Sequence, residues 1–117
     1  MNELRLGRYQ DVLADVEVDH VISDPPYSAR THSAHDGTKG NDGAVRESLS
    51  YGAWTDDDVC TFVDHWGPRA RGWIVVFTDS VLVSTFAAAL AMPENGGRYV
   101  FSPLPLVETG SRVRLQG

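Results

Sequence analysis

Apolar residues recur with a period of two in some segments of the chain and with a period near 3.6 in others. Residues 3–7 and 18–23 alternate and stop at turn-forming residues, so they predict two short strands. Between them, Tyr9, Val12 and Leu13 have helical spacing, which predicts a short helix. A strand, a helix and a strand in so short a span are typical of a βαβ unit.

A clearer helix is predicted from residue 55, with Thr55 as its N-cap and three aspartates in its first turn. Its apolar positions fall on one face and comprise Val59, Phe62, Val63 and Trp66. Residues 72–79 read as a nearly continuous apolar strand, which we expect to be buried on both faces of a parallel sheet. Another helix follows at 80–92 and ends before Pro93.

The remaining segments carry weaker patterns. Residues 98–108 and 111–117 are predicted as two further strands, although prolines interrupt the first. Residues 28–51 are rich in Gly, Ser, Asp and His and predict a long flexible loop. The alternation predicts a single domain over residues 1–117 with an open α/β sheet, in which ligands bind beyond the carboxyl ends of strands.

Composition narrows the function classes. The 117 residues include one cysteine, so no disulfide framework or thiolate metal site is expected. The chain shows no membrane span or secretion signal, so a cytoplasmic location is the default expectation. The net charge of −6 weighs against a protein that binds nucleic acid through broad phosphate neutralisation.

The segment Asp24-Pro25-Pro26-Tyr27 follows the second predicted strand and carries the strongest chemical signal. The prolines restrict the backbone, so Asp24 and the Pro25 carbonyl are expected to form two fixed hydrogen-bond acceptors. Their complement is a donor with two hydrogens, such as an exocyclic amino group, and Tyr27 offers a face on which a heterocycle can stack. The alternative is an ordinary Asp-Pro turn followed by a packed tyrosine.

The sequence LRLGRYQDVLADVEVDHVISDPPYSART resembles the opening of amino-group DNA methyltransferases, including those of restriction–modification systems, in which the DPPY motif precedes the cofactor-binding glycine motif. The resemblance implies a Rossmann-like S-adenosylmethionine-dependent fold and a flipped target base. Adenine-N6 and cytosine-N4 enzymes both use DPPY, and adenine N6 is favoured here over cytosine N4. It also implies that Asp24 and Pro25 accept hydrogen bonds from the base amino group, that Pro26 belongs to the same catalytic segment and that Tyr27 stacks on the base.

The resemblance extends to other residues near the motif. It places Asp24 next to the cofactor and makes Gly7 a further cofactor contact, while Arg30, Thr31 and His32 would contact DNA or cofactor. The alternative for these last three is an exposed loop without a role. Relatives usually carry Gly-Asp where this chain has Gly7-Arg8, and the glycine-rich cofactor motif is absent. The implied fold is therefore incomplete, with the cofactor half supplied by a missing C-terminal part or by a separate chain.

Two other groups of residues have open interpretations. His32, His35 and Asp36 have a spacing compatible with a metal, but we interpret them as exposed residues and expect no metal site. Asp79 follows the apolar strand at the same sheet edge as Asp24, so it is a candidate for the site or for the N-cap of the next helix.

Three functions are compatible with these features. The first is the catalytic half of an adenine or cytosine DNA methyltransferase, inactive alone. The second is a non-catalytic module that binds a base or a partner protein, and the third is a decayed remnant whose open sheet edge pairs with another copy.

Overall fold

The computed structural model describes residues 2–36 and 52–106, with the exception of the side chains at 32 and 34–36. It combines helices with a two-stranded parallel sheet. In chain order the elements are α1 (Tyr9–Val12), β1 (Val21–Ser23), α2 (Ala29–Asp36), α3 (Asp56–Trp66), β2 (Ile74–Val76), α4 (Val83–Ala91) and the 3-10 turn η1 (Pro93–Asn95). The predicted mixture of helices and parallel strands is therefore confirmed at this level.

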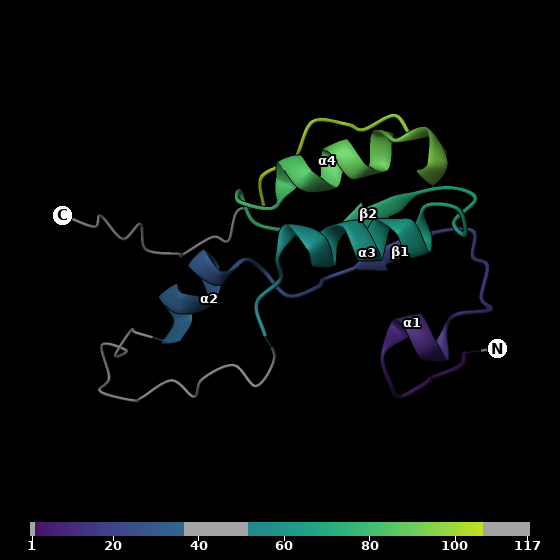
Figure 1. Cartoon of the computed structure of the whole chain (residues 1–117), viewed down its shortest axis with the longest axis horizontal. Coiled ribbons are helices and arrows are strands. Elements are labelled where there is room, and N and C mark those ends of the chain that lie inside the picture. The colour runs from purple at the N-terminus through teal and green to yellow at the C-terminus, as the bar shows by residue number, and fades with distance from the viewer. Residues whose placement is uncertain (1, 37–51, 107–117) are drawn as a thin grey trace.

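Strands β1 and β2 pair in parallel, with Ile22 opposite Val75. Further backbone hydrogen bonds extend the ladder at both ends, from Val21 N–H to the Trp73 carbonyl and from Phe77 N–H to the Ser23 carbonyl. Helix α3 crosses in front of the two strands and α4 lies alongside α3 (Figure 1). The sheet thus delivers the residues after β1 and those after β2 to the same edge.

Helix α3 begins as its sequence predicts. Thr55 is the N-cap, and it forms a capping box in which its hydroxyl accepts from Asp58 N–H while the Asp58 carboxylate accepts from Thr55 N–H. The four predicted core residues of this helix are all buried. They form the main core with Val21, Ala70, Leu82, Phe86 and Ala89.

One face of the sheet is largely uncovered by the described residues, and only the ring of Trp73 has an aromatic neighbour among them, Phe101, at a centroid distance of 5.4 Å. Alternate positions of the ladder point away from the core, and their exposed fractions are 76% for Ile22, 59% for Trp73, 42% for Val75 and 41% for Phe77. We call these four residues the open sheet face. The prediction that residues 72–79 are buried on both faces is therefore wrong, because α3 and α4 cover only the opposite face.

Two other expectations need correction. Residues 3–7 form no strand, and Leu4 and Leu6 are 98% and 100% exposed. The predicted loop at 28–51 contains the helix α2, and its remainder, 37–51, lies outside the described residues.

The C-terminal strands are not found where the structure describes the chain. Residues 98–106 form no strand, whereas the predicted strand at 111–117 lies outside the described residues. Arg98 instead donates hydrogen bonds to the carbonyls of Gly67, Ala70 and Gly72, which ties this segment to the loop before β2. Within residues 2–36 and 52–106, no helix is long and apolar enough to cross a membrane.

Candidate functional site

The segment Asp24–Tyr27 lies immediately after the carboxyl end of β1. Pro25 is buried and Asp24 is exposed, so the buried proline anchors the turn while the carboxylate faces solvent. The Tyr27 hydroxyl donates to Asp24 Oδ1 at 3.0 Å. The tyrosine therefore folds back toward the carboxylate and holds one of its oxygens.

Two acceptors of this segment remain available. Neither Asp24 Oδ2 nor the Pro25 carbonyl accepts a hydrogen bond from any residue in the described part of the chain. Pro26 has no N–H that could compete for them. The turn thus leaves one carboxylate oxygen and one carbonyl oxygen without a donor from the described residues.

Asp79, three residues beyond β2, joins the two strand ends. Its Oδ2 accepts from Ser28 N–H at 3.0 Å, from the Ser28 hydroxyl at 2.5 Å and from the Thr31 hydroxyl at 2.5 Å. Its Oδ1 accepts from the N–H groups of Val81 and Leu82, both at 3.1 Å. One carboxylate therefore holds both the start of α2 and the turn before α4.

These contacts set the protonation of Asp79. Burial raises the pKa of its carboxyl group, but hydrogen bonds from the side chains of Ser28 and Thr31 and from backbone N–H groups outweigh burial and lower the pKa to about 2. The group is ionised at neutral pH. Asp79 therefore acts as a fixed acceptor that positions the residues after the DPPY motif.

The three residues beyond the motif that were predicted to contact substrate have different environments in the structure. Thr31 is bound to Asp79, which gives it a structural role. Arg30 is exposed and makes no hydrogen bond or ion pair within the described residues. The side chain of His32 lies outside the described residues.

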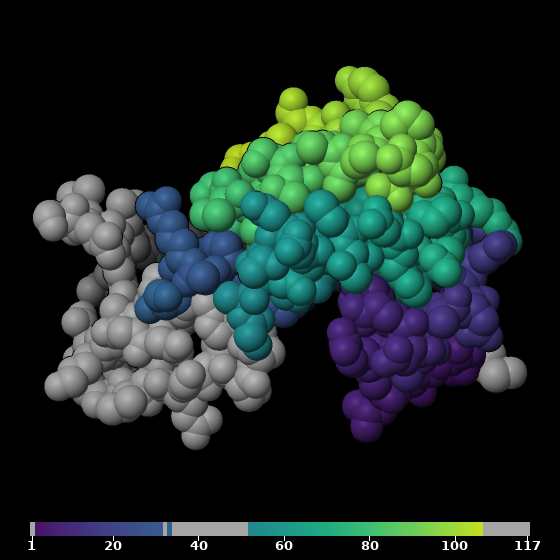
Figure 2. All heavy atoms as spheres, viewed as in Figure 1, coloured from purple at the N-terminus to yellow at the C-terminus, as the bar shows by residue number. Residues whose placement is uncertain are grey.

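A groove runs beside this segment, between the residues around α1 and the start of α3. Its cavity volume is about 370 Å³, and its lining consists of Gly7, Arg8, Tyr9, Gln10, Trp54, Asp58 and Thr61. Figure 2 shows the surface hollowed between the purple N-terminal segment and the teal atoms of α3. We call this cavity the Arg8–Trp54 groove.

The groove is attached to the DPPY motif through the backbone. Trp54 N–H donates to the Tyr27 carbonyl at 2.9 Å, and Ser28 forms a parallel bridge with Trp54. On the other side, Gly7 has a φ of +147°, and a Cβ at this position would lie 2.5 Å from Val12 Cγ1. A glycine is needed here so that the chain can turn and bring Arg8 to the groove.

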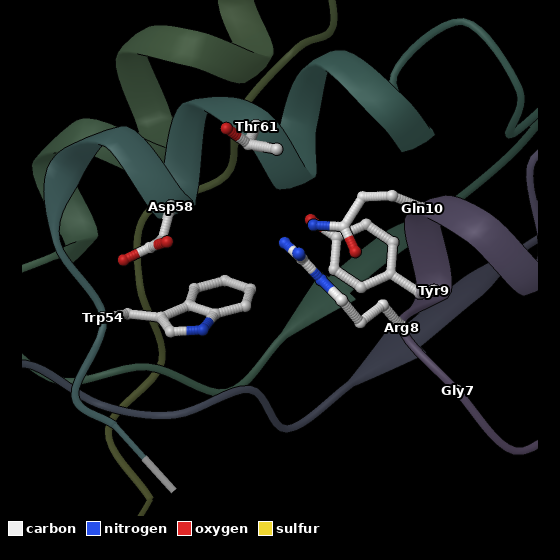
Figure 3. A pocket seen from close by; sticks show the side chains of 7 residues that line it. All are labelled: Gly7, Arg8, Tyr9, Gln10, Trp54, Asp58 and Thr61. Atoms are coloured by element: carbon white, nitrogen blue, oxygen red, sulfur yellow. The ribbon is translucent and has the colours of Figure 1, made fainter.

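The charges of the groove fit S-adenosylmethionine, the cofactor that the resemblance implies, only in part. The Arg8 guanidinium is directed into the space beside Trp54 (Figure 3) and forms no ion pair within the described residues. Arg8 repels the positively charged sulfonium of that cofactor but attracts its carboxylate, and Asp58 in the same lining attracts the sulfonium. The φ of Gly7 gives this residue a role in the turn, and its predicted cofactor contact stays a prediction.

Sequence reasoning missed the link from Ser28 to Asp79 and the contribution of Trp54 to the groove. The spacing of Ser28 and Thr31 on one helical face, opposite an acid at a neighbouring strand end, is a signal that was present in the sequence. No comparable sequence signal predicts the groove, because the residues of its two walls are more than forty positions apart in the sequence.

No group of three or more potential metal-binding side chains occurs within the described residues. Comparisons with protein-family models, with curated proteins and with solved structures give no match to this chain. Functional inference therefore rests on the site itself.

Proposed function

We propose that this chain is the base-binding half of a DNA amino-group methyltransferase. In this role Asp24 Oδ2 and the Pro25 carbonyl accept the two hydrogens of an exocyclic amino group on a flipped base, with adenine N6 favoured over cytosine N4. The observation that carries the proposal is the pair of acceptors, without a donor from the described residues, at the carboxyl end of a parallel strand.

The chemical benefit of two acceptors lies in the electronic structure of the amino group. Its nitrogen lone pair is delocalised into the ring and is a poor nucleophile. Acceptors on both hydrogens favour a more pyramidal nitrogen whose lone pair is available for attack on a methyl group. Asp24 orients the amino group in this mechanism, and the backbone geometry of Pro25 keeps its own carbonyl in place before the base arrives.

Tyr27 has two tasks in the proposal. Its hydroxyl bond to Asp24 Oδ1 limits the rotation of the carboxylate and leaves Oδ2 for the base. Its ring offers a face on which the base can stack. The hydrogen bonds from Ser28 and Thr31 to Asp79 keep this turn in register with the end of β2.

The open sheet face supports the idea of a half rather than a complete enzyme. Parallel sheets are normally covered on both faces, whereas Ile22 and Val75 here are 76% and 42% exposed. We propose that a further polypeptide segment covers this face and supplies the methyl donor. The same observation favours a second candidate function, a non-catalytic module that binds a partner protein through these apolar side chains.

The test compares single-stranded oligonucleotides that contain one adenine or, at the same position, one purine without its amino group. We expect fluorescence anisotropy to show tighter binding of the adenine strand, and Asp24→Ala to reduce this preference. Asp19→Ala is the matched control, because Asp19 is exposed and its carboxylate contacts only Arg71 among the described residues. Equal binding of both strands by the unaltered chain would remove the proposed amino-group contact.

A further inference from the structure

The walls of the Arg8–Trp54 groove are fixed from behind by aromatic packing. The ring of Trp54 lies 5.6 Å from that of Phe62, and the ring of Tyr9 lies 5.7 Å from the same phenylalanine in an edge contact. Tyr9 also stacks on Trp66 at 6.4 Å. The groove therefore offers a flat apolar surface that does not need to be ordered when a ligand binds.

Opposite charges line the groove. Arg8 reaches in from the side of α1, while Asp58 and Trp54 stand on the side of α3 (Figure 3). Asp58 Oδ2 accepts hydrogen bonds from the N–H and the hydroxyl of Thr55. Asp58 Oδ1 and the Arg8 guanidinium have no hydrogen-bond partner within residues 2–36 and 52–106. Both groups are thus available to a ligand.

The charges of Asp58 and Arg8 both affect the pKa of Tyr9, which also lines the groove. Burial raises the pKa of its phenol, the negative charge of Asp58 raises it further and the positive charge of Arg8 lowers it. The hydroxyl therefore stays protonated at neutral pH. A ligand in the groove meets a cation, an anion and a neutral phenol around one aromatic wall.

We infer that the Arg8–Trp54 groove binds an anionic nucleotide, with the base against Trp54 and its phosphate on Arg8. Aromatic and guanidinium planes are the surfaces on which proteins stack nucleobases, and arginine binds phosphate in a bidentate manner. The volume of about 370 Å³ falls in the range of small-molecule sites. The positive charge of Arg8 attracts a phosphate group.

This site goes beyond the proposed function, because it is separate from Asp24 and requires no methyl transfer. The ligand is either a free mononucleotide or one nucleotide of a nucleic-acid strand, and both carry the same base and phosphate chemistry. Trp54 is bonded to the Tyr27 carbonyl, so a strand in the groove would run beside the DPPY segment.

Isothermal titration calorimetry of the full chain with adenosine 5′-monophosphate, adenosine and ribose 5-phosphate tests the site. We expect saturable binding of the mononucleotide, with roughly tenfold weaker binding of adenosine, because a charge-assisted phosphate contact is lost. Ribose 5-phosphate should also bind at least about fivefold more weakly, because base stacking is lost.

Variants locate the ligand. Arg8→Gln should remove the preference for the mononucleotide over adenosine, while Arg71→Gln, which alters another exposed arginine, should leave it unchanged. Trp54→Ala should weaken both ligands and Trp54→Phe should retain most binding, so the pair separates loss of stacking from loss of folding. Asp24→Ala should not affect mononucleotide binding, so failure of the proposed function and failure of this site are distinguishable.

A short single-stranded oligonucleotide distinguishes the two sources of the nucleotide. Binding at least about tenfold tighter than that of the mononucleotide, and weakened by Arg8→Gln, would identify a nucleic-acid strand as the ligand. Similar affinity for both would identify a free nucleotide, and either result supports the site. Absence of saturable mononucleotide binding, or equal mononucleotide affinity in Arg8→Gln and the unaltered chain, would overturn the inference.

Discussion

The carboxylate of Asp79 holds Ser28 by two hydrogen bonds, from its backbone N–H at 3.0 Å and from its hydroxyl at 2.5 Å. Because Ser28 directly follows the DPPY motif, this contact joins the turn after β1 to the turn after β2. The same carboxylate also accepts from Thr31 and from the turn before α4. Asp79 is therefore the residue on which the local order of the candidate site depends most.

Replacement of Asp79 should destabilise the chain. Asp79→Ala leaves Ser28 N–H and two hydroxyl groups without their acceptor, so we expect the free energy of unfolding to fall by about 2–3 kcal/mol. Urea unfolding measures this change. Asp11→Ala is a suitable control, because the exposed Asp11 side chain makes no hydrogen bond within the described residues, and its effect should stay within about 0.5 kcal/mol. Equal effects of the two variants would contradict the role of Asp79.

The low pKa of Asp79 makes stability depend on acid. Its folded-state pKa of about 2 lies below the ordinary value of 3.8, so its ionisation stabilises the fold above the ordinary value, and this contribution is lost as pH falls through the folded value. In Asp79→Asn this contribution is absent at every pH. The difference in unfolding free energy between the two proteins should therefore be constant near neutral pH and shrink from about pH 4 to about pH 2. A difference that does not change in this range would be incompatible with the proposed hydrogen bonding.

Gly7→Ala should disturb the α1 wall of the groove. The added Cβ would lie 2.5 Å from Val12 Cγ1, and the φ of +147° is strained for any other residue. We expect a loss of about 1–3 kcal/mol in unfolding free energy, measured by urea denaturation. Gly52→Ala is the matched control, since no atom lies within 4 Å of a Cβ there. If Gly7→Ala were as harmless as Gly52→Ala, the close approach would not exist in solution.

The open sheet face should bind apolar dyes in the isolated chain. Ile22→Asp and Val75→Asp place charges on side chains that are 76% and 42% exposed, so each should lower the fluorescence of a bound naphthalene sulfonate dye with limited loss of stability. Leu104→Asp changes an exposed leucine outside this face and should leave the fluorescence nearly unchanged. Unchanged dye binding in both sheet variants would show that the face is covered in solution.

The contrast between α3 and the two strands explains what the sequence could predict. The cap at Thr55 and the apolar face of α3 depend on neighbours within one or two turns, and the structure agrees with both predictions. The apolar pattern of a strand does not determine which segments pack on its two faces. The exposed side of β2 could therefore not be predicted from the residues of β2. Helix α2 was missed because its sequence is polar, and its start is held by the distant Asp79.

The candidate site likewise has features that the sequence could predict and features that only the folded chain shows. The location of Asp24 after a strand followed from the two prolines, which end the preceding apolar run. The hydrogen bond from Tyr27 to Asp24 and the groove beside Trp54 required the folded chain, because both depend on how turns are oriented in space. The roles of Asp24, Pro25 and Tyr27 toward a base stay predictions.

The most direct test of the central claim is the ratio of dissociation constants for the purine and adenine oligonucleotides, measured by anisotropy on the unaltered chain and on Asp24→Ala. We expect a ratio of roughly ten for the unaltered chain, because the acceptors at Asp24 and Pro25 are left without donors when the amino group is missing. In Asp24→Ala the ratio should fall toward about one, while Asp19→Ala keeps it. A ratio near one in the unaltered chain, or an unchanged ratio in Asp24→Ala, would contradict the assignment of the DPPY segment to a base amino group.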